Sequence, residues 1–259
     1  GTLTESGLCV LRVDRMRGLV DVFPGEEHDD DMVAAFNYCL HGTGGAAPSI
    51  DTAMHALIGL AHVDHLHPDS GIALATAADG PELTRRCFGD TVVWVPWRRP
   101  GFALALDIAE IQRSNPQAIG CVLGGHGITA WGSTSKECEA NSERIIGTAE
   151  RFINENGRPD PFGAVLPGYE PLPEEERYAL AAQLAPVIRG MASRDRRMVG
   201  HLTDSNVVLD FLSRERHREL AALGTSCPDH FLRTKVRPMV LDLPPSSPVA
   251  EIGARLHEL

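Results

Sequence analysis

The stretch HVDHLHPDS, residues 62–70, holds three histidines and two aspartates directly after the apolar residues 50–60. His65 and His67 are two positions apart, so on an extended segment both rings point to the same side of the chain. Two imidazoles placed in this way can bind one metal ion. An isolated H-x-H pair is more often solvated or structural. The stretch alone therefore leaves a metal site, an acid–base cluster and a solvated loop open.

A third histidine lies in VLGGHGITAWG, residues 122–132. His126 follows a buried strand pattern and stands between Gly125 and Gly127, whose small size leaves the imidazole unshielded. For His126 alone, a core histidine bonded to a backbone carbonyl is the alternative. Together with the H-x-H pair it favours a catalytic zinc site, which needs three protein ligands and an open position.

Parity along the strand excludes two neighbours from the predicted ligand set. Asp64 faces away from His65 and His67, because successive side chains of an extended chain alternate. His62 is placed before the extended segment, near the end of the preceding helix. We therefore expect neither residue to bind the metal.

Hydrophobic periodicity predicts alternating strands and helices over residues 1–156, followed by a linker and a mainly helical α/β extension. The expected strands are GLCVLRV (7–13), TVVWVPW (91–97) and AIGCVLGG (118–125). The expected helices span residues 29–40, 50–60, 70–79, 103–114 and 134–157. Residues 157–176 are rich in proline and glycine and are predicted to be the linker. The extension, 177–259, is predicted to hold helices over 175–193 and 207–224 and a strand over 236–244.

Composition excludes several classes of partner. The net charge is −11, with 24 Lys and Arg against 35 Asp and Glu, which argues against nucleic acid and anionic membranes. No stretch has the length of a spanning helix, and no signal peptide is visible. The six cysteines are scattered without CxxC spacing, so we expect reduced thiols in a cytoplasmic protein.

Three motifs together resemble the class II aldolase/adducin family: PSID (48–51), HLHP (65–68) and GGHGITAWG (124–132). Within the family, the chain looks most similar to the aldolase part of bifunctional rhamnulose-1-phosphate aldolase/short-chain alcohol dehydrogenases. The resemblance implies an α/β fold for residues 1–156, namely a three-layer α/β/α sandwich with a mixed, mainly antiparallel sheet. It also implies a homo-oligomer, a tetramer in the family.

The resemblance also assigns roles to residues. His65, His67 and His126 match the family's zinc ligands. Asp51 matches the acid–base residue, which is usually glutamate in the family and therefore one methylene longer. The expected contacts of the substrate phosphate are Ser49, Gly44 and Gly45, the glycines because a glycine-rich turn before a helix presents N–H groups to an anion.

The implied reaction is the zinc-dependent retro-aldol cleavage of a ketose 1-phosphate, most specifically L-rhamnulose 1-phosphate. A Schiff-base mechanism is disfavoured, because Lys136 and Lys235 are the only lysines and neither belongs to the constellation. A zinc-dependent sugar-phosphate epimerase or dehydratase, or a non-catalytic adducin-like assembly module, are the alternatives.

Four further expectations complete the interpretation. The abrupt start at GTLTESG suggests that part of the domain, with phosphate-binding loops, precedes residue 1. The chain lacks a nucleotide-binding glycine fingerprint and a YxxxK motif, so a dehydrogenase domain is expected to lie outside it. His55 is interpreted as a helix residue with a hydrogen-bonded ring. Residues 224–238, with Asp229, His230, Arg233 and Lys235, are interpreted as a solvated, salt-bridged turn.

Overall fold

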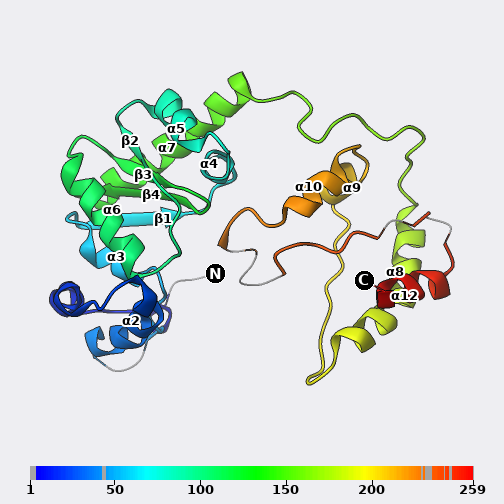
Figure 1. Ribbon diagram of the computed structural model, residues 1–259, viewed down its shortest axis with the longest axis horizontal. Coiled ribbons are helices and arrows are strands. Elements are labelled where there is room, and N and C mark those ends of the chain that lie inside the picture. Colours follow the sequence, from blue (N-terminus) through cyan, green and yellow to red (C-terminus); the bar gives the residue numbers. More distant parts are fainter. Residues whose placement is uncertain are drawn as a thin grey trace. The chain divides into compact units, whose positions relative to one another are not determined.

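One mixed four-stranded sheet organises the computed structural model of the chain, which describes residues 4–42, 45–228, 230, 235–241, 243–244 and 247–258. Its strands are β1 (His62–Leu66), β2 (Val92–Val95), β3 (Gly120–Leu123) and β4 (Gly127–Gly132). They lie in the order β1-β4-β3-β2, and only the β2–β3 pair is parallel (Figure 1). β1 and β3 are both antiparallel to β4, so β1, β2 and β3 run in one direction. Their carboxyl ends therefore meet at the same edge of the sheet.

Helices cover both faces of this sheet (Figure 1). One face carries α3 (Thr52–Leu57) and α6 (Phe102–Ser114), and the other carries α4 (Asp69–Ala75), α5 (Gly80–Phe88) and α7 (Ser135–Asn156). The pleat divides the strand side chains between two cores: Cys121 and Leu123 pack on the α3–α6 side, whereas Val122 packs on the α4–α5–α7 side. The predicted three-layer α/β/α sandwich with a mainly antiparallel sheet is confirmed.

Short helices precede α3 and join the core on the α3–α6 side, where Met16 and Phe36 are fully buried. They are η1 (Glu5–Gly7), α1 (Val13–Gly18), η2 (Leu19–Val22), η3 (Glu26–His28), α2 (Asp29–Ala35) and η4 (Phe36–Cys39). Asp29 is buried, and its Oδ1 accepts hydrogen bonds from the backbone N–H groups of Phe102 (2.8 Å) and Ala103 (3.1 Å). A side chain from α2 thus caps the first turn of α6.

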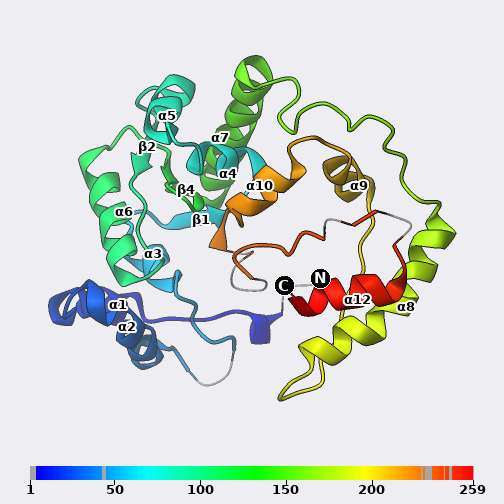
Figure 2. The same cartoon turned by 45° about the vertical axis from the view of Figure 1, so that its right-hand side comes forward.

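The chain divides into two compact units. The first comprises Gly1–Gly157 with Ser226–Pro228, and the second comprises Arg158–Thr225 with Asp229–Leu259. The described helices of the second unit are α8 (Glu174–Ala192), α9 (Asn206–Leu212), α10 (His217–Leu223) and α12 (Val249–Glu258). α12 packs along α8, as Figure 2 shows. None of the described helices combines the length and the apolar character needed to cross a membrane, and all six cysteines are free thiols.

Four details of the predicted secondary structure are wrong. Residues 7–13 do not form a strand; Leu11 makes one isolated bridge to Leu40, and α1 begins at Val13. The described residues of 236–244 form no strand either. Conversely, β4 and α5 were not predicted, although β4 is a central strand. Because β4 begins and ends with glycine, the sequence pattern did not identify the β-forming residues between them as a strand.

Candidate metal centre

Three imidazole rings converge on one point at the edge of the sheet. The Nε2 atom of His65 lies 3.1 Å from the Nε2 atom of His67 and 3.1 Å from that of His126. The ring planes of His65 and His67 are at 90°, and those of His65 and His126 are at 87°. The candidate ligand atoms all lie within 4.8 Å of one another. The rings are thus not stacked, and each turns a nitrogen toward a shared centre.

The topology of the sheet explains this convergence. His65 belongs to β1, opposite Thr129 of β4, and His67 follows the last residue of β1. His126 belongs to the turn that joins β3 to β4. Because the carboxyl ends of β1 and β3 meet at one edge, histidines 61 positions apart in the sequence become neighbours. This edge is where open α/β sheets bind their ligands.

Two glycines make room for the rings. Gly125 has a φ of +65°, a left-handed conformation that favours glycine. A Cβ atom at Gly127 would lie 2.5 Å from Cδ2 of His67 and 2.6 Å from the carbonyl oxygen of Leu66. Any side chain at position 127 would therefore displace His67 from the cluster.

The state of His65 suits a metal ligand. Its Nδ1 atom lies 3.1 Å from the carbonyl oxygen of Ile128, so Nδ1 carries the proton and donates it. The lone pair of Nε2 then faces the other two rings. Burial, and next the neighbouring His126 and His67, lower the pKa of His65 to about 3. A neutral imidazole whose free nitrogen faces two others, with its second nitrogen held by a carbonyl, fits the donor set of a divalent cation.

Asp51 directly precedes α3, and its side chain is half-buried. Its carboxylate is not one of the atoms that lie within 4.8 Å of one another. His55, one helical turn beyond Asp51, is the smallest of the causes that lower the pKa of His65, after burial and the two other histidines. Residues four apart share a helix face, so Asp51 and His55 lie on the same side of α3.

The ring of His55 differs from its prediction. The side chain is exposed, and within the described part of the chain the ring makes no hydrogen bond. His55 does lie in a helix, as expected, but the expected hydrogen bond of its ring is absent from the described part of the chain.

The expected phosphate contacts are only partly described. Ser49 and Gly45 are exposed in the loop before α3, and Gly44 lies outside the described residues. The backbone N–H of Ser49 donates to Oγ1 of Thr52 (2.7 Å). Helix α3 begins at Thr52, after the loop that holds Gly45 and Ser49. The expected contacts with a substrate phosphate stay a prediction.

The two residues excluded from the ligand set lie outside the cluster. Asp64 points to the opposite face of the sheet, where its Oδ2 accepts a hydrogen bond from Oγ of Ser142 in α7 (2.7 Å). His62 is the first residue of β1, paired with Gly132, rather than part of the preceding helix. It shares the parity of Asp64 and therefore faces away from His65.

Trp97 lies near the candidate site, although the sequence analysis did not single it out. The side chain of Trp131 does pack in the core, but that of Trp97 is 71% exposed. Trp97 follows β2, whose carboxyl end reaches the same edge as the histidines, and a Cβ atom on Gly125 would lie 2.6 Å from its Cδ1. The indole therefore covers the turn that carries His126. In the sequence, a tryptophan between a proline and an arginine is the feature that could have indicated an exposed ring.

Ion pairs hold the loop that carries Trp97. Arg98 pairs with Glu26 and Asp107, and Arg99 pairs with Asp30. These contacts tie the loop to η3, α2 and α6. The ion pairs on Arg98 and Arg99 thus hold the neighbouring Trp97 in position.

Part of the segment 224–238 lies outside the residues that the structure describes. Asp229 and Arg233 lie outside the described residues, and His230 and Lys235 are exposed. The interpretation of this segment as a salt-bridged turn stays a prediction.

Comparisons with known proteins identify the family. Residues 1–153 match the model of the class II aldolase and adducin N-terminal domain. The chain belongs to the class II aldolase and adducin family. Residues 179–259 of this family member match a second model, described as the second domain of class II aldolases. Class II aldolases use a divalent metal, and the three-histidine cluster is compatible with one.

Three known proteins are similar to this chain. The N-terminal class II aldolase domain of a conserved protein from Thermoplasma acidophilum is 27% identical, with a TM-score of 0.52, covering 59% of this chain and 70% of that one. The structure of YgbL from Escherichia coli is 25% identical, covering 46% of this chain and 63% of that one, at a TM-score of 0.37. The uncharacterized oxidoreductase YuxG of Bacillus subtilis is 36% identical over 95% of this chain, which spans 35% of YuxG.

Proposed function

We propose that this chain is a zinc-dependent lyase that cleaves a ketose 1-phosphate by a retro-aldol reaction. The proposed substrate is L-rhamnulose 1-phosphate, and the products are dihydroxyacetone phosphate and L-lactaldehyde. The observation that carries the proposal is the convergence of the Nε2 atoms of His65, His67 and His126, with 3.1 Å contacts from His65 to the other two. Three neutral imidazoles add no negative charge of their own to such a site.

Each part of the site has a chemical task. When bound by the three histidines, zinc would supply a Lewis acid for the negative charge that develops on the ketone oxygen as the carbon–carbon bond breaks. The carbonyl oxygen of Ile128 holds His65 in the tautomer whose Nε2 faces the centre. Asp51, directly before α3, would move the proton between the reacting carbon and solvent. Ser49 and Gly45, in the exposed loop before Asp51, would contact the substrate phosphate.

The choice of substrate rests on the motifs and on one relative. YuxG is named an oxidoreductase and is much longer than this chain. That relation fits a resemblance to the aldolase part of aldolase–dehydrogenase fusions, and so supports L-rhamnulose 1-phosphate. We further propose a cytoplasmic homo-oligomer that takes this small phosphorylated sugar and binds neither nucleic acid nor membrane.

The test combines metal analysis with an aldol-cleavage assay. We expect about one zinc ion per chain, cleavage that chelator abolishes, and recovery when zinc is restored. Asp51→Asn should keep the zinc and lose cleavage, whereas Asp51→Glu, which restores the longer carboxylate, should remain active. Cleavage unaffected by chelator would contradict the zinc mechanism. Zinc binding with isomerisation or water loss in place of cleavage would indicate the epimerase or dehydratase alternative. A chain without either metal or turnover would indicate an assembly module.

A further inference from the structure

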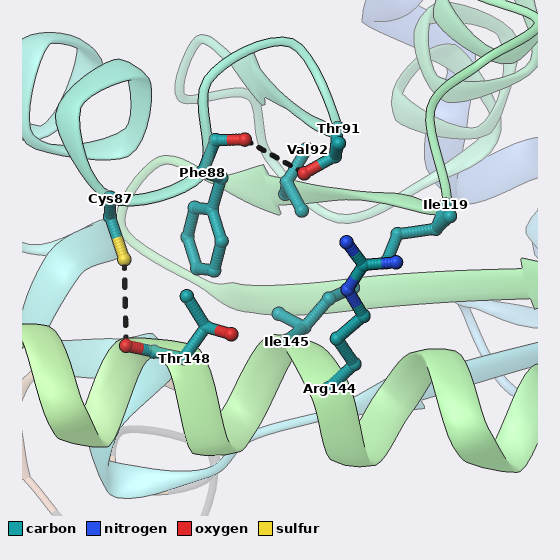
Figure 3. Close-up of a pocket in the computed structure, with 8 residues that line it drawn as sticks. All are labelled: Cys87, Phe88, Thr91, Val92, Ile119, Arg144, Ile145 and Thr148. Atoms are coloured by element: carbon teal, nitrogen blue, oxygen red, sulfur yellow. Dashed lines mark hydrogen bonds between the residues drawn. The ribbon is translucent and has the colours of Figure 1, made fainter.

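A cavity lies far from the histidines, where the strands of the sheet have their amino ends. It is a half-open cavity of about 170 Å³ between the end of α5, the start of β2 and the middle of α7 (Figure 3). Its lining includes Thr91 and Val92 at the start of β2 and Ile119 just before β3. These are the amino ends of the strands whose carboxyl ends point toward the metal centre. The length of the sheet therefore separates the two sites.

The floor of this cavity is apolar. Phe88, Val92 and Ile145 contribute buried side chains to it, and Figure 3 shows the Phe88 ring and Ile145 facing the same space. Cys87 also lines it, but burial raises the pKa of its thiol to about 11, and Sγ donates to the carbonyl oxygen of Thr148 (3.8 Å). The thiol therefore stays protonated at neutral pH and adds neither charge nor a nucleophile.

Arg144 is the one charged side chain among the residues that line the cavity. Figure 3 shows its guanidinium rising from α7 beside Ile119, at the rim. Nine other arginines of the structure each pair with a carboxylate: Arg12, Arg85, Arg98, Arg99, Arg113, Arg177, Arg214, Arg216 and Arg255. Within the described residues, Arg144 has no such partner. Its donors are available for an anion.

The surroundings select the kind of anion. Cys87 and Phe88 are the last residues of α5, and the carboxyl end of a helix carries a partial negative charge that disfavours a dianion more than a monoanion. A single guanidinium presents a planar fork that matches one carboxylate. The volume of about 170 Å³ is below the roughly 300 Å³ of a pocket for drug-sized ligands. From these features we propose that the cavity binds a small monocarboxylate with a short apolar body, held by Arg144 over Phe88 and Ile145.

Benzoate is a suitable probe, because it joins one carboxylate to a small apolar ring. In methyl NMR spectra of the whole chain, benzoate should shift the signals of Ile119 and Ile145 and leave that of Ile58, in the core on the other face of the sheet, in place. We expect a dissociation constant of about 1 mM or weaker, because a single charge-assisted contact holds the ligand. Benzamide, which has the same shape without the charge, should bind at least about tenfold more weakly.

Arg144→Gln should weaken benzoate binding about tenfold, and it should fold normally because the side chain is exposed. Arg113→Gln is the matched control, since it removes the same charge from the surface of α6. The proposal is overturned if the Ile145 signal does not move, if benzamide binds as well as benzoate, or if both variants weaken binding equally. Inorganic phosphate competing better than benzoate would also overturn it, because the site would then favour a dianion.

Discussion

The two units of this chain are built in different ways. In the first, every residue of β3 and β4 is buried, and two cores fill the space between the sheet and its helices. In the second, α8 and α9 contain no buried residue. Large apolar side chains there stay in contact with water, such as Val199 (92% exposed) and Val207 (77%). The first unit can hold a cluster of rings in place, whereas the second is shaped mainly by local contacts.

The positions of the candidate site residues follow this difference. All three histidines and Asp51 belong to the first unit. His126 is 3% exposed and stands in a three-residue turn whose neighbours are packed. A site that needs its donors held closely in place is therefore found where the backbone has little freedom.

The largest expected effect is on metal retention. His126→Ala should abolish it, because two histidines without the third rarely hold zinc against dialysis. His62→Ala, the matched control, should leave the zinc content nearly unchanged, since this side chain faces away from the cluster. Elemental analysis after dialysis measures both. Equal loss in the two variants would show that the ligand set is wrong.

The next effect compares two isoleucines in helices. Ile108 of α6 is fully buried, and Ile188 of α8 is 46% exposed. Ile108→Ala should lower the free energy of unfolding by about 2–5 kcal/mol, whereas Ile188→Ala should change it by about 0.5 kcal/mol or less. Urea unfolding followed by circular dichroism gives both values. A loss at Ile188 as large as at Ile108 would mean that the second unit has a core of its own.

A smaller effect is expected at two helix starts. Asp29 accepts hydrogen bonds from two backbone N–H groups of α6 while buried, so Asp29→Ala should cost about 1–3 kcal/mol. Ser205 precedes α9 without a side-chain capping bond, so Ser205→Ala should cost a few tenths of a kcal/mol. Thermal melts of the two variants rank them. A reversed ranking would contradict the contrast between the units.

The smallest expected effect concerns Trp97. Trp97→Phe should change stability by less than about 0.5 kcal/mol, because the side chain is 71% exposed. Its fluorescence should nevertheless be quenched when Co²⁺ replaces zinc, since the indole covers the turn of His126. The quenching should decrease in Trp97→Phe, although not to zero, because Trp94 also lies against this turn at Gly124. Undiminished quenching in the variant would place the signal elsewhere.

The sequence pattern predicted the meeting of the three histidines, whereas the three layers of the fold were predicted from the family resemblance. Strand parity separated His65 and His67 from Asp64, and the glycines beside His126 marked the turn. The strand predicted over 7–13 failed because alternation indicates a half-buried strand only if one side is covered. Leu8 and Val10 are instead about half exposed, at 47% and 52%.

Other features depend on contacts that no local pattern reveals. Capping of α6 by Asp29 joins residues more than 70 positions apart, and the placement of Trp97 over Gly125 depends on the parallel pairing of β2 with β3. Helix α5 carried a readable signal in its early proline and in the Gly89 that follows it.

The pairing of β1 with β4 also has a consequence for folding kinetics. His65 and His126 are 61 positions apart, so a metal ion shared between them would close a long loop of the chain, as a disulfide does. The complete three-histidine site forms only when β1 is paired with β4, and β1 could then not leave the sheet without the ion losing a ligand. Adding a chelator should therefore accelerate the unfolding of the sheet.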